Sequence, residues 1–163
     1  MIFVTVGTHE QQFNRLVEYM DKWAAEHEEE VVIQTGYSTY EPKHCKWQKL
    51  FPYQEMSKKV AEARIVITHG GPSSFIAPLQ IGKTPIVVPR EKRFDEHVND
   101  HQVKFCKQVE SRMGTIIVVD DIDKLGETIE KHNEIKKEGK NTSNNALFCA
   151  NFESIVNEMF RNN

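Results

Sequence analysis

The feature that most constrains this chain is a regular alternation of short apolar runs with segments of helical periodicity. The apolar runs are rich in β-branched residues and lie at 2–6, 31–36, 64–68, 85–89 and 115–119, so they predict strands. Helical spacing fills the segments between them, at 11–27, 54–63, 73–82 and 98–112. Because continuously apolar strands must be covered on both faces, the pattern predicts an α/β domain with a doubly wound, mostly parallel sheet.

The remaining segments are predicted less directly. Residues 37–50 are polar and irregular, and we expect a strand around 47–51 that joins the sheet. Asp120 or Asp121 could cap a further helix, and the polar run 133–145 is expected to be a surface connection. A last helix near 146–161 would carry an apolar stripe of Phe148, Phe152, Ile155, Val156, Met159 and Phe160. This stripe packs either on the domain's own sheet, which we favour, or on a partner.

Length and charge narrow the possibilities. With 163 residues the chain suits one domain, 1–163, and its net charge of −3 gives no sign of nucleic-acid binding. The three cysteines, Cys45, Cys106 and Cys149, are odd in number and widely spaced, as expected of reduced thiols in a cytoplasm. The N-terminal apolar run is shorter than a signal peptide or a spanning helix requires. We therefore predict a cytoplasmic protein that another molecule would have to bring to a membrane.

Two glycine-containing junctions follow predicted strands. The first offers Gly7, Thr8 and His9, and the second, THGGPSSF, offers His69, Gly70, Gly71, Pro72, Ser73 and Ser74. Ligands of open parallel sheets sit at the carboxyl ends of strands, where helix N-termini present free N–H groups, so both junctions could bind phosphate oxygens. The alternative is that the glycines only permit tight turns and that Ser73 is an ordinary cap. Neither GxGxxG nor GxxxxGK[ST] occurs, which disfavours an NAD enzyme or a kinase.

The loop after the fourth long apolar run concentrates polar side chains. It carries the cations Arg90, Lys92 and Arg93, followed by Glu96, His97, Asn99, Asp100, His101 and Gln102. Such a set can bind anions and sugar hydroxyls, and a helix starting near Val98 would place Asn99, Asp100 and Gln102 in its first turns. His97 and His101 have the spacing of a metal pair, but no third ligand accompanies them, so we predict no metal site.

These residues together resemble a known family. HGGPSS, the segment ending in GKTP, VVP and DHQ are similar to the C-terminal domain of glycosyltransferase family 28, the donor-binding half of GT-B enzymes. VTVGT and EHVNDHQ resemble small soluble subunits of bacterial exopolysaccharide and capsule glycosyltransferases, which look like the donor-binding subunit of the dolichol-linked N-acetylglucosaminyltransferase. The resemblance covers about residues 1–120 and implies a single Rossmann-like domain.

The resemblance also implies roles for particular residues. His69, Gly70, Gly71, Pro72, Ser73 and Ser74 would hold the diphosphate of a UDP-sugar, with Gly7 and Thr8 as the opposite wall. Phe51, Tyr53 and Gln54 lie in the segment that would receive the uracil base. Asp100 and Gln102 match the pair that reads sugar hydroxyls. Glu96, His97 and Asn99 are further candidates from the same loop, and Arg90 could help to stabilise the departing diphosphate. Many relatives carry a Glu for the ribose hydroxyls where this chain has Ala77, so ribose recognition must differ.

A complete GT-B enzyme has two domains, and by resemblance this chain would supply one of them. By resemblance, the partner would be a membrane-anchored subunit that binds a lipid-linked saccharide acceptor and holds this protein at the inner face of the membrane. The implied reaction is inverting transfer of a hexose from a UDP-sugar, without a cofactor. His9 is the local candidate for a catalytic contribution, or else a turn histidine. Two alternatives are a non-catalytic nucleotide-sugar-binding enhancer of a complete transferase and a nucleotide-sugar epimerase or hydrolase.

Overall fold

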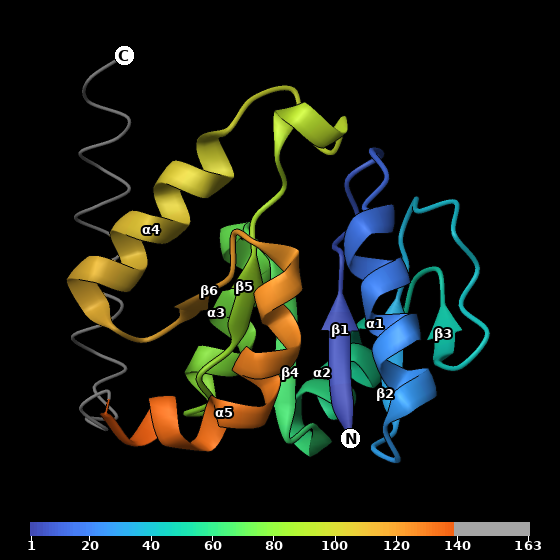
Figure 1. Ribbon diagram of the computed structural model, residues 1–163, viewed down its shortest axis with the longest axis horizontal. Coiled ribbons are helices and arrows are strands. Elements are labelled where there is room, and N and C mark those ends of the chain that lie inside the picture. Colours follow the sequence, from blue (N-terminus) through green and yellow to red (C-terminus); the bar gives the residue numbers. More distant parts are fainter. Residues whose placement is uncertain (139–163) are drawn as a thin grey trace.

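The protein is built around one six-stranded parallel sheet with the order β3-β2-β1-β4-β5-β6. The computed structural model describes residues 1–138, and Figure 1 shows the arrangement of the elements. The strands are β1 (Ile2–Thr5), β2 (Val31–Gln34), β3 (Lys46–Gln48), β4 (Ile65–His69), β5 (Ile86–Val88) and β6 (Ile117–Val118). The helices are α1 (Asn14–Glu26), α2 (Tyr53–Glu62), α3 (Pro72–Gln80), α4 (His101–Met113) and α5 (Leu125–Glu138), with short 3₁₀ turns at Lys92–Phe94 and Ile122–Lys124.

Successive side chains of each central strand point to opposite faces of the sheet and pack against different helices. Ile2 and Val4 of β1 pack with Leu16 of α1 and Leu125 of α5, so α1 and α5 cover one face. On the other face the core is divided: Phe3 packs with residues of α2, whereas Phe75 and Phe105 join α3 and α4 in a separate cluster. The strands are therefore apolar on both sides, as a doubly wound sheet requires, and α2 and α3 leave a groove between their clusters.

The order of the strands fixes the place where a ligand can enter. From β1 the chain crosses through α1 to β2, and from β4 it crosses through α3 to β5 on the other side of the sheet. Neighbouring β1 and β4 pair in register, with Thr5 opposite Thr68. Because the two crossovers leave in opposite directions, a crevice opens at the carboxyl ends of β1 and β4.

The expected fold is confirmed, with shifted boundaries. The edge strand β3 ends at Gln48, and α4 begins at His101, so Asn99 precedes the helix and Asp100 occupies its N-cap. Asp121 caps the 3₁₀ turn by accepting a hydrogen bond from the Asp123 amide, and α5 continues to Glu138, into the segment expected to be a surface connection. The predicted helix near 146–161 and Cys149 lie outside the described residues. Within residues 1–138, no helix is long and apolar enough to cross a membrane.

Candidate functional site

An open cavity of about 900 Å³ lies at the crevice between β1 and β4 and continues along the groove between α2 and α3. It gathers much of both glycine junctions. Its lining residues are Thr5, Gly7, Thr8, His9, Glu10, Gln34, Tyr53, Met56, Ser57, Val60, Ala61, His69, Ser73, Ser74, Ala77, Gln80 and Ile81.

The two junctions meet around the imidazole of His69. A Cβ atom added to Gly7 would lie 2.3 Å from His69 Nε2, and one added to Gly71 would lie 2.2 Å from His69 Cε1. Gly7 also has a φ of +77°, which disfavours other residues. The glycines therefore do more than permit turns, because they leave the space in which the His69 ring sits.

The ring is fixed by two hydrogen bonds. His69 Nδ1 accepts the Gly71 amide at 3.0 Å, and His69 Nε2 lies 2.8 Å from Ser74 Oγ. Burial lowers the pKa of His69 to about 4, and the positive charge of Arg90 acts in the same direction. The imidazole is therefore neutral at physiological pH, so it acts through its hydrogen bonds and not as a cation.

The inner end of the cavity is held by a side chain that the sequence did not single out. Gln34 donates to Thr5 Oγ1 at 3.1 Å and accepts the Phe51 amide at 3.1 Å. Thr5 Oγ1 in turn accepts the Gly7 amide at 3.2 Å. This chain of hydrogen bonds ties the ends of β1 and β2 to the segment before α2. Gln34 lies within an apolar predicted strand, and a polar residue there is the only signal that sequence reasoning could have used.

The α2 side of the cavity departs in part from the expectation for the base-binding segment. Tyr53 lines the cavity and is exposed, whereas Gln54 is exposed but is not among the lining residues. Phe51 packs edge-on against Phe3 with ring centroids 6.0 Å apart, so its side chain serves the core. Further along the helix Met56, Ser57, Val60 and Ala61 complete this wall, and their spacing of three and four residues marks one face of α2.

Arg90 was expected to bind an anion, and the structure corrects this expectation. Its side chain is fully buried, and its guanidinium donates to the carbonyl oxygens of Val6, Gln11, Gln12 and Glu96 at 2.8–3.1 Å. Burial lowers its pKa to about 10, which leaves it charged. Arg90 therefore joins the β1–α1 loop to the loop after β5, and its charge is not presented to the cavity.

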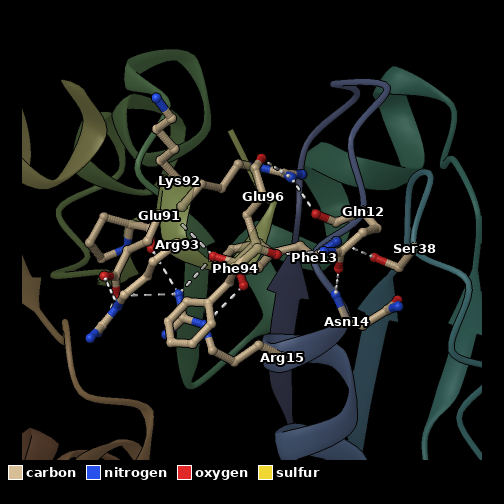
Figure 2. A network of polar contacts seen from close by, with 12 residues as sticks. Gln12, Phe13, Asn14, Arg15, Ser38, Glu91, Lys92, Arg93, Phe94 and Glu96 are labelled. Carbon is tan, nitrogen blue, oxygen red and sulfur yellow. Dashed lines mark hydrogen bonds and ion pairs between the residues drawn. The ribbon is translucent and has the colours of Figure 1, made fainter. Parts of the chain in front are cut away.

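The expectation for Glu96 is corrected too, because this side chain is also buried and bound within the protein. Its buried carboxylate accepts two hydrogen bonds from Arg15 of α1, both at 2.9 Å, and one from the Glu91 amide. Figure 2 shows Arg15 and Glu96 within this network, together with Phe94. The guanidinium groups of Arg15 and Arg93 lie over the Phe94 ring, 4.7 and 4.6 Å from its centroid. The loop is thus braced by its own charges.

The other residues of this loop do not line the cavity. The ring of His97 is 5.4 Å from that of His9, centroid to centroid, so His97 extends the site beyond His9. Asp100 accepts the Lys92 amide, and Asn99 accepts the His101 amide. Gln102 accepts the Arg90 amide at 3.1 Å and neighbours Gly70. Gly70, Gly71 and Pro72 likewise shape the His69 turn without lining the cavity themselves.

Two further features of the molecule bear on ligand binding. Among residues 1–138 no group of three or more His, Cys, Asp and Glu side chains is arranged to hold a metal ion. A second hollow of about 720 Å³ lies near the ends of β5 and β6, lined by Arg15, Glu91, Arg93, Phe94, Val103, Lys107, Asp120, Asp121, Ile122 and Asp123. Its cations are paired, since Arg93 contacts Glu91 and Lys107 contacts Asp120.

Solved structures that resemble this chain include two glycosyltransferases. The glycotransferase of kitacinnamycin has a TM-score of 0.60 at 16% identity, over 86% of this chain and 38% of that one. The spinosyn forosaminyltransferase SpnP has a TM-score of 0.59 at 13% identity, over 98% and 42%. At these identities the likeness shows the fold, and this chain corresponds to about two-fifths of each enzyme.

Sequence comparison also finds glycosyltransferases. The UDP-N-acetylglucosamine transferase subunit ALG13 of Yarrowia lipolytica is 29% identical over 82 residues, which are 49% of this chain and 39% of that protein. A family model described as the glycosyltransferase family 28 C-terminal domain matches residues 1–159. Because this match spans nearly the whole chain, the protein belongs to the glycosyltransferase family 28 C-terminal domain family.

Proposed function

We propose that this chain is the UDP-sugar-binding subunit of an inverting glycosyltransferase that transfers a hexosyl group to a lipid-linked saccharide, in exopolysaccharide or capsule biosynthesis. The observation that carries the proposal is the cavity at the β1–β4 crevice, where Gly7, His69, Ser73 and Ser74 form a polar end. An open parallel sheet binds nucleotides at this place, and small residues at a helix N-terminus suit a diphosphate.

The proposed orientation follows the shape of the cavity. The diphosphate lies at the N-terminal end of α3, near Ser73 and Ser74, and the uridine extends along the groove between α2 and α3. Ala77 lines this groove, so a carboxylate for the ribose hydroxyls is missing at that position. Gln80, one turn further along α3, also lines the groove and is the amide that we propose for this role.

The proposed chemistry uses this end of the cavity to stabilise the leaving group. The acceptor hydroxyl oxygen forms a bond to the anomeric carbon while the bond from that carbon to the diphosphate breaks, and the hydroxyl proton passes to a base. Helix N–H groups and serine hydroxyls then stabilise the charge on the departing UDP, where one such donor contributes about 3 kcal/mol. We place the base on the partner subunit, with His9 as the local candidate.

The partner completes the enzyme in this proposal. The matched relatives are more than twice as long as the region they share with this chain, and the one from Yarrowia lipolytica is named as a subunit. We propose a membrane-anchored subunit that binds the lipid-linked acceptor and keeps this chain at the cytoplasmic face. UDP-N-acetylglucosamine is the first donor to test, because that relative is named for it.

Calorimetric titration of the purified chain with UDP, UDP-N-acetylglucosamine, other UDP-hexoses and ADP tests the proposal. We expect uridine nucleotides to bind in preference to ADP and Gln80→Ala to weaken them, with Lys58→Ala on the exposed side of α2 as the matched control. The same titrations with the partner present, followed by a transfer assay, separate the alternatives. Transfer by the partner alone would favour an enhancer, and conversion of the donor without acceptor would favour an epimerase or hydrolase. No uridine nucleotide binding in either state would refute the proposal.

A further inference from the structure

The hydrogen bonds of His69 determine which of its nitrogens carries the proton. Nδ1 accepts the Gly71 amide hydrogen at 3.0 Å, so it must present a lone pair. In a neutral imidazole the proton is then on Nε2. Nε2 lies 2.8 Å from Ser74 Oγ, and this contact is therefore a hydrogen bond donated by His69 and accepted by the serine.

This direction leaves the hydroxyl hydrogen of Ser74 available. Within residues 1–138 the Ser74 hydroxyl donates no hydrogen bond that would compete, and Ser74 lines the cavity. We infer that His69 is a positioning residue, which turns the Ser74 hydroxyl into an obligatory donor aimed at an anionic oxygen of the ligand. The inference rests on the proposed function for the identity of that ligand, a nucleoside diphosphate.

The surroundings of the ring oppose a direct ionic contact with phosphate. His69 is only 8% exposed, and both of its nitrogens already have partners in the protein. A second proton would have to sit on Nδ1, where it would face the Gly71 N–H. Burial is the largest influence that lowers the pKa of His69, followed by the charge of Arg90. A side-chain hydrogen bond with Gln102 opposes the shift, and His9 and His97 add to it.

The ring lies against the backbone of both glycines and is held by its two hydrogen bonds. Cβ atoms added at Gly7 and Gly71 would reach its Nε2 and Cε1 sides at 2.3 and 2.2 Å, so the ring fills the space that a side chain at either position would need. A fixed ring fixes the serine in turn. The polar end of the cavity would then favour a group with acceptors only, such as an ionised diphosphate, over a group that must itself donate at this position.

The tautomer is measured by ¹H–¹⁵N correlation through two-bond couplings in protein labelled at histidine nitrogens, with His69→Gln to assign the signal. We expect His69 to be neutral with its proton on Nε2 at neutral pH, near pH 5, and after addition of UDP. His27 supplies an internal reference, because its Nδ1 lies 2.7 Å from the Trp23 carbonyl oxygen and must carry a proton. A doubly protonated His69 in the UDP complex, or a proton on Nδ1, would overturn the inference.

Titration of the variants with UDP tests the consequence. Ser74→Ala and His69→Ala should each weaken UDP binding about ten- to one-hundredfold, the range for one hydrogen bond to a charged group, and the double variant should be no weaker than the singles. His69→Gln retains an N–H near the Nε2 position and should recover most of the affinity. Additive losses, or unchanged binding by Ser74→Ala, would contradict the positioning role. If the wild-type chain binds no uridine nucleotide, the proposed function fails while the tautomer measurement still decides this inference.

Discussion

Gly71→Ala is a direct perturbation of the His69 turn. Gly71 has φ −76° and ψ 128°, a conformation that alanine adopts without strain, so the backbone itself does not oppose the change. The new methyl group would lie 2.2 Å from His69 Cε1, whereas carbon atoms in contact are ordinarily about 3.5–4.0 Å apart. The ring must therefore move by more than about 1 Å, which breaks its bonds to the Gly71 amide and to Ser74.

The magnitude follows from these losses. Two hydrogen bonds at about 1 kcal/mol each and an overpacking cost of about 1–3 kcal/mol predict a free energy of unfolding lower by about 3–5 kcal/mol. Urea unfolding of wild type, Gly71→Ala, His69→Ala and the double variant measures both the loss and its cause. Since His69→Ala removes the clashing atoms, Gly71→Ala should cost less than about 1 kcal/mol in that background. An equal cost in both backgrounds would refute the steric argument.

Three further predictions concern residues outside this turn. Asp21 is buried, and its carboxylate accepts hydrogen bonds from the amides of Lys43, His44 and Cys45 and from the Tyr40 hydroxyl. These bonds outweigh the opposing effect of burial and lower the pKa of Asp21. Asp21→Ala removes them and should lower the free energy of unfolding, measured in urea, by about 3 kcal/mol. The difference in stability between wild type and Asp21→Ala should be fully present above the ordinary Asp pKa of 3.8 and should shrink as the pH falls below it. A difference that stays the same at lower pH would contradict the lowered pKa of Asp21. In Arg90→Lys, the single ammonium group cannot reach all four carbonyl acceptors, so the free energy of unfolding should fall by about 3 kcal/mol. Weaker UDP binding at unchanged stability would instead indicate that Arg90 contacts the ligand. Lys83→Met removes hydrogen bonds to the Val60, Ala61 and Ala63 carbonyls at the end of α2 and should lower the melting temperature by several degrees. The control Lys58→Met, at an exposed position of the same helix, should not lower it. Equal melting temperatures for the two variants would refute this role of Lys83.

Periodicity was sufficient to predict the fold because every central strand is apolar on both sides. Strand order also explains why the two glycine junctions lie side by side, because β1 and β4 are neighbours in the sheet. The function of each glycine was not predictable in the same way. The clash that an added Cβ would make depends on the position of the His69 ring, which comes from the other side of the crevice for Gly7.

Charged residues were the main source of error in the predicted site. In the sequence, Arg90 and Glu96 resemble any exposed loop cation and carboxylate. Their burial depends on partners about 80 residues away, the carbonyls of Val6 and Gln11 for Arg90 and the guanidinium of Arg15 for Glu96. Gln34 was missed for the converse reason, because it is embedded in an apolar strand and its side chain turns toward the site.

The central claim is that a uridine nucleotide occupies the cavity between α2 and α3 at the β1–β4 crevice. Amide chemical-shift mapping of ¹⁵N-labelled protein during titration with UDP tests it most directly. We predict that the largest shifts cluster at Gly7, Thr8, Ser73 and Ser74 and continue along Ser57 and Ala77. Shifts concentrated instead around Lys107 and Asp120 in the second hollow, or no shifts at saturating UDP, would contradict it.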